Sequence, residues 1–257
     1  MARFMITIEY EGTRYSGWQV QKNARTVQGE LMRAIGEATN TDRFEFMGSG
    51  RTDAGVHALA QVAHLEIATQ LAPHILRMRI NDTLPADINV IDVAKAHPRF
   101  HARHHAVSRG YLYQIAQRRT AFGKRYVWWV KDRLSADAMH QACGVFQGFH
   151  DFRSFTADDP DEKSTTVELQ ECSLHEMGQM LVIRIRGSHF LWKMVRQMVG
   201  MIVEAGRGTT TPDTIAGLLR SHSTLPATST APPSGLFLDH VLYEEGPPPP
   251  VRPLITL

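Results

Sequence analysis

The stretch GSGRTDAGVHA, residues 48–58, places three glycines around one arginine and one carboxylate. Residues 43–46 just before it alternate polar and apolar side chains, which is typical of a half-buried strand. Because glycine lets a backbone bend sharply or approach another group closely, the pattern predicts a turn at a strand end that presents Asp53. An aspartate often does no more than close such a turn, but Arg51 and Thr52 beside it favour a functional loop.

The sequence around this loop predicts alternating strands and helices. Apolar residues at positions 4, 6, 8 and 10 indicate a strand with one buried face. Thr26 is placed to cap a helix, and Pro73 fits the first turn of another. In the order β-α-β-β-α-β, we expect strands at 4–10, 43–46, 60–67 and 88–93, and helices at 27–40 and 71–80.

The second half of the chain shows a similar alternation. Ser135 and Thr211 are expected helix caps, Gly148 is placed to end the helix that Ser135 begins, and residues 158–163 form a polar loop that contains proline. This half looks like an enlarged copy of the first, which predicts an α+β protein of two joined ferredoxin-like units. The expected elements are strands at 111–115, 127–130, 167–174, 180–185 and 236–242, and helices at 136–147, 188–205 and 212–219.

The crossing between the halves is expected in residues 94–108, which are rich in His and Arg and lack periodicity. We therefore predict an N-terminal half at 1–105 that carries the Asp53 loop and a C-terminal half at 106–245 that completes the site. The remaining residues, 246–257, begin with a run of prolines and are expected to form an extended tail without a catalytic role.

The composition predicts a globular protein in a reducing compartment. A chain of 257 residues with 43% hydrophobic content can bury a sizeable core. Two cysteines, Cys143 and Cys172, are too few for a disulfide framework or a cysteine-rich zinc site. No segment approaches the roughly 20 apolar residues that cross a bilayer, and the start lacks the apolar run of a signal peptide. We expect a cytoplasmic protein.

Positive charge is concentrated in one window of the chain. Between Asp92 and Asp132 there is no acidic residue, whereas nine lysines and arginines and four histidines fall within these 39 positions. A run of charge usually marks only a solvated surface, but here tyrosines and tryptophans are interleaved with it, which favours a surface for a polyanion. The positive residues are Lys95, Arg99, Arg103, Arg109, Arg118, Arg119, Lys124, Arg125 and Lys131.

The eight residues GRTDAGVH, 50–57, resemble the catalytic-loop signature of the tRNA pseudouridine synthase A family. Other blocks similar to that family occur in the family's order over nearly the whole chain. They are EYEGT at 9–13, YSGWQ at 15–19, FHAR at 100–103, YLY at 111–113, DFRSF at 151–155, FLWKMVR at 190–196 and GLFL at 235–238.

This resemblance implies a pseudouridine synthase fold, in which two ferredoxin- or RRM-like α/β halves with largely antiparallel sheets flank a central active-site cleft. It implies an isomerase that converts uridine to pseudouridine in the anticodon stem-loop of tRNA. The reaction of this family needs neither a metal nor an organic cofactor, although some eukaryotic relatives are associated with zinc. Family members act as homodimers, so the expected partners are tRNA and a second copy of the chain. The sequence also lacks a P-loop and a dinucleotide fingerprint.

The resemblance also implies roles for individual residues. Asp53 corresponds to the nucleophile, which attacks either the ribose or the pyrimidine ring. Arg196 corresponds to its electrostatic partner, and a nearby positive charge favours the carboxylate that the attack needs. Tyr111 corresponds to a tyrosine that stacks on the target base, and Arg51 to an arginine that helps to expel the nucleotide from its stack. Leu236 corresponds to an apolar residue beside the pocket.

Arg103 and Arg109 are expected to bind the RNA substrate, because both belong to the basic window. From the pattern alone, Tyr111 would be a core aromatic residue and Arg196 a solvated helix residue. The chain departs from the family at Gly110 and at Trp192-Lys193, which affects local backbone shape and RNA contacts rather than the reaction.

Two other functions fit parts of the pattern. A hydrolase could use Asp53 as its nucleophile, but such enzymes normally need a second acid or base nearby, and the loop holds no second carboxylate. A noncatalytic RNA-binding protein would retain the basic window alone. A zinc site at His101, His104 and His105 is disfavoured because Arg103 lies among them and cysteines are absent from the group.

Overall fold

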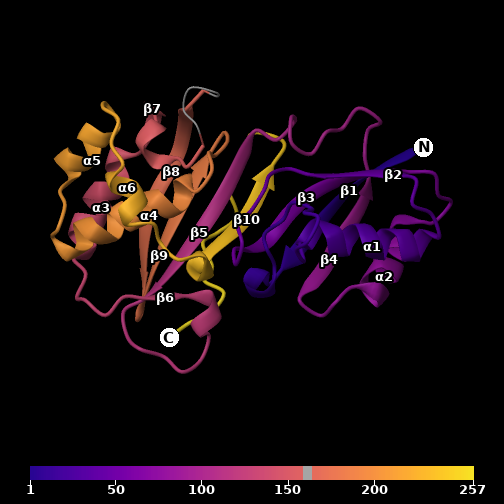
Figure 1. Ribbon diagram of the computed structural model, residues 1–257, viewed down its shortest axis with the longest axis horizontal. Coiled ribbons are helices and arrows are strands. Elements are labelled where there is room, and N and C mark those ends of the chain that lie inside the picture. The colour runs from indigo at the N-terminus through magenta and orange to yellow at the C-terminus, as the bar shows by residue number, and fades with distance from the viewer. Residues whose placement is uncertain (159–163) are drawn as a thin grey trace. The chain divides into compact units, whose positions relative to one another are not determined.

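A computed structural model describes residues 1–158 and 164–257 of the chain (Figure 1). Most of the polar loop expected at 158–163 therefore lies outside the described residues. The chain divides into two compact units, each described here by itself. Unit 1 comprises Met1–Val107 and Phe237–Pro247, and unit 2 comprises Ser108–Leu236 and Pro248–Leu257.

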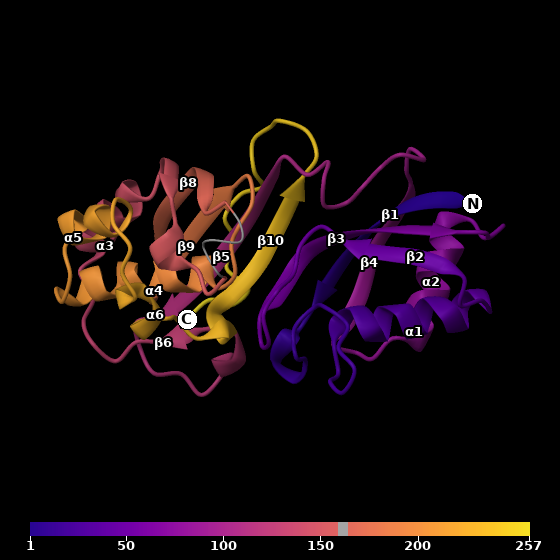
Figure 2. The ribbon, with the colours of Figure 1, turned by 45° about the horizontal axis from the view of Figure 1, so that its top comes forward.

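Unit 1 is an antiparallel sheet covered by two helices that lie side by side (Figures 1 and 2). The predicted order β-α-β-β-α-β is confirmed. The elements are β1 (Ala2–Tyr10), α1 (Val27–Thr39), β2 (Phe44–Gly48), β3 (His57–Ile67), α2 (Pro73–Thr83) and β4 (Ile88–Lys95). β1 lies between β4 and β3 and runs antiparallel to both, and β2 is antiparallel to β3.

Local sequence explains these elements well. Phe4, Ile6, Ile8 and Tyr10 of β1 are all buried, as their alternation predicts. The side chain of Thr26 accepts a hydrogen bond from the backbone N–H of Gly29 and so caps α1. α2 begins at Pro73, where the missing N–H of proline costs no helical hydrogen bond.

The strand β10 (Leu236–Leu242) is far from unit 1 in sequence, but most of it belongs there. Phe237 and Leu238 pair in parallel with His57 and Ala58 at the beginning of β3. The ring of Phe237 also stacks on the buried ring of His57, with the centroids 4.7 Å apart. The division predicted from the sequence, with halves at 1–105 and 106–245 and a tail at 246–257, stays a prediction.

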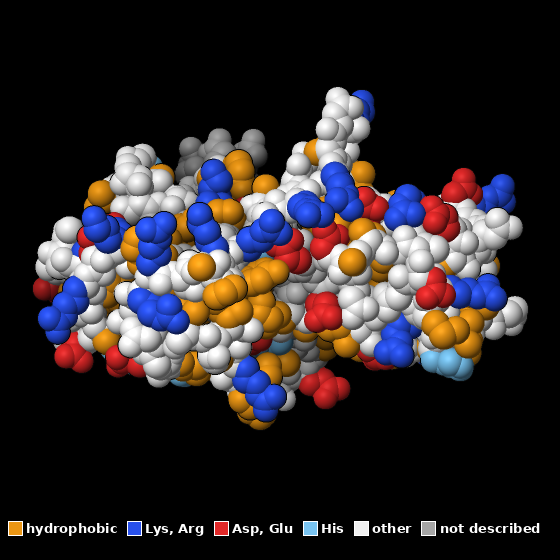
Figure 3. Space-filling model, turned by 90° about the horizontal axis from the view of Figure 1, so that it is seen from below, with side chains coloured by type: hydrophobic (Ala, Val, Ile, Leu, Met, Phe, Trp, Pro, Cys, Tyr) orange, Lys and Arg blue, Asp and Glu red, His pale blue; other side chains and the backbone are white. Residues whose placement is uncertain are grey.

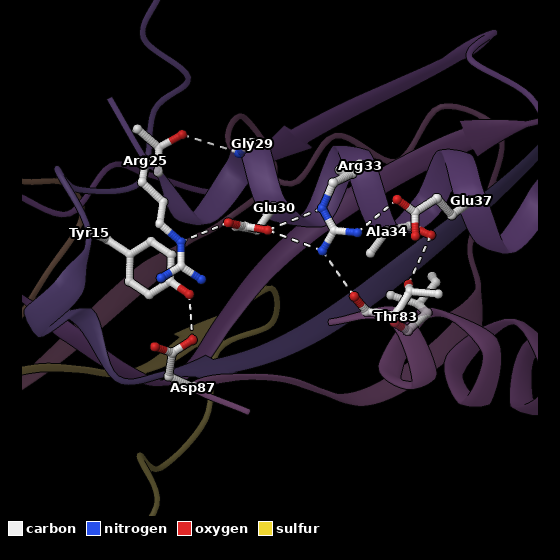
Figure 4. A network of polar contacts seen from close by, with 11 residues as sticks. Tyr15, Arg25, Gly29, Glu30, Arg33, Ala34, Glu37, Thr83 and Asp87 are labelled. Carbon is white, nitrogen blue, oxygen red and sulfur yellow. Dashed lines mark hydrogen bonds and ion pairs between the residues drawn. The ribbon is translucent and has the colours of Figure 1, made fainter. Parts of the chain in front are cut away.

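A chain of ion pairs runs along α1 (Figure 4). Glu30 accepts from Arg25 at 2.8 Å and from Arg33 at 3.2 Å. Arg33 also donates to the carbonyl of Thr83 at the end of α2, at 2.9 Å. The pKa of Glu30 is lowered, mainly by the hydrogen bond from Arg25. The network therefore fixes α1 against α2 and against the segment that precedes α1.

Unit 2 is a second antiparallel sheet, in the order β5-β9-β8-β7. Its strands are β5 (Ser108–Ala116), β6 (Trp128–Trp129), β7 (Gly148–Asp151), β8 (Thr166–Met177) and β9 (Met180–Gly187). The short β6 pairs in parallel with the end of β5. The sequence predicted each of these strands except β7, which is too short to show a clear alternation. β7 begins at Gly148, so this residue starts a strand rather than ending the preceding helix.

The helices of unit 2 are α3 (Ala136–Val145), α4 (Met194–Arg207), α5 (Pro212–Leu218) and α6 (Leu225–Thr228). α3 and α4 pack side by side, and α3 lies on β8 (Figures 1 and 2). The expected start of α4 at residue 188 is wrong, because the helix begins only at Met194. Lys193 before it has a φ of 63°, a left-handed conformation that interrupts a right-handed helix.

In the described part of the chain, no helix is long and apolar enough to cross a membrane. Cys143 and Cys172 are both buried and not joined in a disulfide.

The lowered pKa of Glu30 makes the contribution of its ion pairs dependent on pH. Because the folded state favours the carboxylate, this contribution is present above the ordinary glutamate pKa and is lost as pH falls. Urea unfolding should show that Glu30→Gln lowers the free energy of unfolding by about 0.5–1 kcal/mol at pH 7, because Arg25 and Arg33 are partly exposed.

The difference between Glu30→Gln and wild type should shrink as pH falls below the ordinary glutamate pKa, and it should approach zero only below the lowered pKa of Glu30. Glu37→Gln is the matched control, since Glu37 also pairs with Arg33 but is 51% exposed. If Glu30→Gln lowered the free energy of unfolding by the same amount at every pH, the charge of Glu30 would not be what stabilises α1.

Candidate active site

The Asp53 loop, residues 49–56, joins β2 to β3 in unit 1. Side-chain hydrogen bonds hold it to the sheet on either side. The hydroxyl of Ser49 donates to the Oε1 atom of Gln61 on β3 at 2.7 Å. The hydroxyls of Thr52 and Tyr10, which ends β1, are 2.8 Å apart and bond to each other. Thr52, Ser49 and Gln61 are all buried, so the base of the loop has a fixed shape.

Residues 15–18, which lie between β1 and α1, form a second support for the Asp53 loop. The backbone N–H of Trp18 donates to the carbonyl of Thr52 at 3.1 Å, and the N–H of Gly55 donates to the carbonyl of Tyr15 at 3.4 Å. These bonds hold the backbone on both sides of Asp53. This contact depends on the tertiary fold and is not predicted by the local sequence.

Tyr15 is itself anchored from two directions (Figure 4). Its hydroxyl donates to the carboxylate of Asp87, just before β4. The guanidinium of Arg25 lies over its ring, 4.8 Å from the centroid. Burial, and then the hydrogen bond to Asp87, raises the pKa of Tyr15 above its ordinary value, so the phenol stays protonated and keeps donating. The network along α1 therefore reaches the segment that supports the Asp53 loop.

Two of the three glycines of the motif have a clear structural reason. Gly55 has a φ of 78°, which side chains rarely tolerate. A Cβ atom on Gly48 would lie 2.7 Å from the ring of Trp18, which is only 1% exposed. A Cβ atom on Gly50 would meet nothing within 4 Å. The close approach predicted for the glycines thus applies to Gly48 and not to Gly50.

Asp53 and Arg51 lie two residues apart in this loop. Asp53 is half-buried, and Arg51 is exposed. The Nε atom of Arg51 donates to the side chain of Gln19 at 3.1 Å, which links the loop once more to the segment before α1. Arg103 is also in unit 1, but in the turn that follows β4, where it is exposed.

Tyr111 and Arg109 lie on β5 in unit 2, two positions apart and thus on one face of the strand. The ring of Phe190 stands edge-on to the ring of Tyr111, with the centroids 5.1 Å apart. The Nη1 atom of Arg109 donates to the carbonyl of Ser188 at 2.7 Å. Both partners come from the irregular segment before α4, so that segment orients the two candidate residues.

The structure distinguishes Tyr111 from its neighbour Tyr113. Tyr113 is fully buried, and its hydroxyl donates to the carbonyl of Pro232 at 2.8 Å. Burial raises the pKa of Tyr113 well above its ordinary value. Tyr111 is only half-buried. Tyr113 is therefore the core aromatic residue of β5, whereas Tyr111 is the more exposed of the two.

Arg196 lies in the first turn of α4 and is half-buried. Its Nε atom donates to the carbonyl of Ala231 at 2.8 Å, and the N–H of Ala231 donates to the carbonyl of Arg196 at 3.0 Å. The first bond holds the side chain and the second holds the backbone, so Arg196 is not simply a solvated side chain on the helix surface.

Segment 231–236 connects the candidate residue Arg196 with β5 and ends at the candidate Leu236. It binds Arg196 through Ala231 and Tyr113 through Pro232. A Cβ atom on Gly235 would lie 2.7 Å from the ring of Tyr113, so the chain passes directly over β5. Leu236 follows and is 4% exposed. The apolar packing role expected for Leu236 agrees with this burial.

The histidines of the basic window cluster after β4. The rings of His101 and His104 have centroids 4.2 Å apart, and His64 is 4.8 Å from His101. Burial, and then the neighbouring His104, lowers the pKa of His101, which favours its neutral form. Among the residues that the structure describes, no group of three or more His, Cys, Asp and Glu side chains has a geometry that could hold a metal ion.

Several structural residues of the site were not found from the sequence. Gln61 and Asp87 carry no local signal, because their partners Ser49 and Tyr15 are 12 and 72 residues away. The block at 15–19 was noticed as a family resemblance, but its contact with the loop depends on the tertiary fold. An alignment showing which polar residues vary together would have been the signal to use.

Comparison with known proteins defines the class of protein. A family model described as tRNA pseudouridine synthase matches residues 6–105 and 142–244. The protein is thus an isomerase with the α+β fold of pseudouridine synthases.

Similar curated proteins give the particular family. A tRNA pseudouridine synthase A of Rhodopseudomonas palustris is 40% identical over 247 residues, which cover 95% of this chain and 100% of that protein. One of Maridesulfovibrio salexigens is 37% identical over 95% of this chain and 92% of its own length. One of a Geobacillus species is 37% identical over 94% and 98%. The chain belongs to the tRNA pseudouridine synthase family.

The packing of Gly48 against Trp18 predicts different effects for two similar substitutions in one loop. Gly48→Ala should lower the free energy of unfolding by about 1–3 kcal/mol, because the new methyl group meets a buried ring that cannot move aside. Gly50→Ala, the matched control, should unfold within about 0.5 kcal/mol of wild type. Urea denaturation of the three proteins measures both values. Equal stability of the two variants would contradict the packing.

Proposed function

We propose that this chain converts uridine to pseudouridine in the anticodon stem-loop of tRNA, with Asp53 as nucleophile and without a cofactor. The observation that carries the proposal is the GRTDAGVH loop, which combines the motif with a backbone fixed from two sides in a chain of this family. In this reaction the N-glycosidic bond breaks, the base turns, and a carbon–carbon bond to the same ribose forms. No atom is gained or lost, so no redox partner is needed.

The fixed loop suits a nucleophile. A carboxylate must be held close to the atom that it attacks, and a rigid backbone lowers the entropic cost of that approach. Asp53 is half-buried, so part of it is open to a substrate. Attack on the ribose and attack on the pyrimidine ring both remain compatible with the proposal.

The residues of unit 2 are assigned complementary roles. Arg196 is proposed to stabilise the Asp53 carboxylate, and the bond from its Nε atom to the carbonyl of Ala231 supports a fixed guanidinium. Tyr111 is proposed to stack on the target base, because its ring is only half-buried beside Phe190. Leu236 is proposed to pack beside the pocket.

Arg51 is proposed to help extrude the target nucleotide from its stack, a step that costs a few kcal/mol and needs compensating contacts. Its exposed position beside Asp53 supports this role. Arg109 and the exposed arginines and lysines of the basic window are proposed to bind phosphates. Of these exposed residues, the proposal concerns Arg99, Arg103, Arg118, Arg119, Lys124 and Arg125; Lys95 and Lys131 are exposed as well.

We further propose that the protein works in the cytoplasm, where tRNA is its partner, and as a homodimer. The membership in a tRNA-modifying family supports the first of these proposals. Light scattering at working concentration tests the second, and a monomer would contradict it.

Pseudouridine mapping by mass spectrometry tests the proposed substrate and the absence of a cofactor together. The purified wild-type protein should form pseudouridine in the anticodon stem-loop of an unmodified tRNA transcript, in buffer with EDTA and no added cofactor. Pseudouridine elsewhere in the tRNA would contradict the proposed position. Activity that EDTA abolishes and added zinc restores would contradict metal independence. Binding of tRNA without any product would favour the noncatalytic RNA-binding function.

A further inference from the structure

Residues 117–131 of unit 2, here called the basic arm, leave the end of β5 and return through β6. The segment has no acidic residue and five positive ones. All five of these are exposed. Figure 3 shows Lys and Arg side chains around exposed hydrophobic ones on this side of unit 2, in the left half of the view. The positive residues of the basic arm are Arg118, Arg119, Lys124, Arg125 and Lys131.

The basic arm also exposes large aromatic side chains. Phe122 is 84% exposed and Trp129 is 41% exposed. The guanidinium of Arg119 lies over the ring of Trp129, 5.9 Å from its centroid. Exposed aromatic rings beside positive charges are typical of surfaces that bind unpaired RNA, because bases stack on the rings while phosphates meet the charges. A duplex with its bases already paired and stacked would use only the charges.

The two ends of the basic arm are fixed to β5. The N–H of Val130 donates to the carbonyl of Ala116 at 3.2 Å, next to the pairing of Trp128 with Ile115. The side-chain amide of Gln114 on β5 donates to the carbonyl of Tyr126 at 2.7 Å. Gln114 is only 1% exposed, so this bond is shielded from water.

The last nine residues, 249–257, here called the strap, lie against this same region. Val251, Pro253, Ile255 and Leu257 are half-buried, whereas the residues between them are exposed. The strap therefore has one face towards the protein, although it forms no strand. The N–H of Leu254 donates to the Oε1 atom of Gln114 at 2.6 Å. One buried side chain thus binds the basic arm and the strap at the same time.

Apolar packing joins the strap to the basic arm as well. Ile255 and Leu257 pack on a buried cluster of Ala116, Val127 and Met180, in which Val127 belongs to the basic arm. A Cβ atom on Gly123 would lie 2.5 Å from the Cδ1 atom of Ile255. Gly123 has a φ of 66° and begins the turn that displays Lys124 and Arg125. The strap thus fills the space under the turn of the basic arm.

We propose that the basic arm binds unpaired nucleotides of the tRNA substrate, by base stacking on Trp129 and Phe122, and that the strap sets its shape. The partner class rests on the function proposed above, whereas the contact between strap and basic arm does not. The strap takes no part in the chemistry. Loss of the strap contacts lets residues 120–127 move. The positive side chains of the basic arm then no longer lie beside the rings of Phe122 and Trp129.

Matched substitutions on the two faces of the strap test this proposal. Ile255→Ala with Leu257→Ala removes the inward side chains, and Leu254→Ala with Thr256→Ala removes outward ones while keeping the backbone bond to Gln114. Affinity for an unmodified tRNA transcript is measured by fluorescence anisotropy between about 50 and 200 mM salt, a range over which phosphate contacts weaken strongly.

The inward pair should raise Kd about 5- to 10-fold and reduce the slope of log Kd against log salt by about one to two, since each lost phosphate contact contributes about 0.7–0.9. The loss should appear in KM rather than in kcat. The outward pair should match wild type. A wild-type Kd and slope for the inward pair, in protein that circular dichroism shows to be folded, would overturn the role of the strap.

Trp129→Ala tests the basic arm with the strap intact and should also raise Kd severalfold. Combined with the inward pair, it should add less than its separate effect, because both act on one surface. If the fold-increases in Kd of Trp129→Ala and of the inward pair multiplied fully in the combined variant, strap and basic arm would not be coupled. A wild-type Kd for Trp129→Ala would overturn base stacking on Trp129. These readouts measure binding alone. If the wild-type protein modified a uridine outside the anticodon stem-loop, the proposed function would be wrong. The effect of the strap substitutions on tRNA affinity would still hold.

Discussion

The packing of residues 15–18 against the Asp53 loop is the contact on which the candidate site in unit 1 depends. A loop of this kind carries no helix or strand of its own, so its backbone can be ordered only by groups from elsewhere. Trp18 and Tyr15 supply them through backbone bonds to Thr52 and Gly55, and Tyr10 adds a buried hydroxyl. Each of these supports comes from β1 or from the segment that follows it. The first residues of the chain therefore shape a loop some 40 positions later.

In unit 2 as well, an irregular segment orders residues of the candidate site. Residues 231–236 cross β5, where they bind Arg196 on one side and Tyr113 on the other. The same strand that buries Tyr113 leaves Tyr111 partly open beside Phe190. In both units, helices and strands form the scaffold. Segments without regular structure supply contacts that orient the residues proposed for chemistry. This arrangement is common in enzymes, because loops can vary without disturbing the core.

The parts of the fold that local physical chemistry controls could be predicted from the sequence. Thr26 caps α1 and Pro73 begins α2 as expected, because a helix start depends on the side chains within one turn. The start of α4 could not be predicted, since Lys193 adopts a left-handed conformation that its residue type does not favour. The pairing of β10 with β3 could not be found either, because it joins residues about 180 positions apart.

In the site, too, features that depend on nearby residues could be predicted, and features that depend on tertiary contacts could not. The family motif pointed to Asp53 directly, and the assignments of Asp53, Arg196 and Tyr111 to the reaction stay predictions. Burial distinguishes two tyrosines that look alike in the sequence: Tyr113 is fully buried, and Tyr111 is only half-buried. The proline-rich end of the chain was expected to be an extended tail. It forms no helix or strand, and Ile255 and Leu257 pack on a buried cluster of unit 2. They belong to a set of half-buried apolar residues at every second position, which are Val251, Pro253, Ile255 and Leu257.

The most direct test of the account is a single-turnover reaction of Asp53→Asn and Asp53→Ala with unmodified tRNA, in which tRNA affinity is measured on the same samples. The account predicts no detectable pseudouridine from either variant, with a Kd within about threefold of wild type, because the carboxylate acts in the chemistry and the loop backbone remains fixed. Pseudouridine formed by either variant at a rate near that of wild type would contradict the assignment of Asp53 as nucleophile.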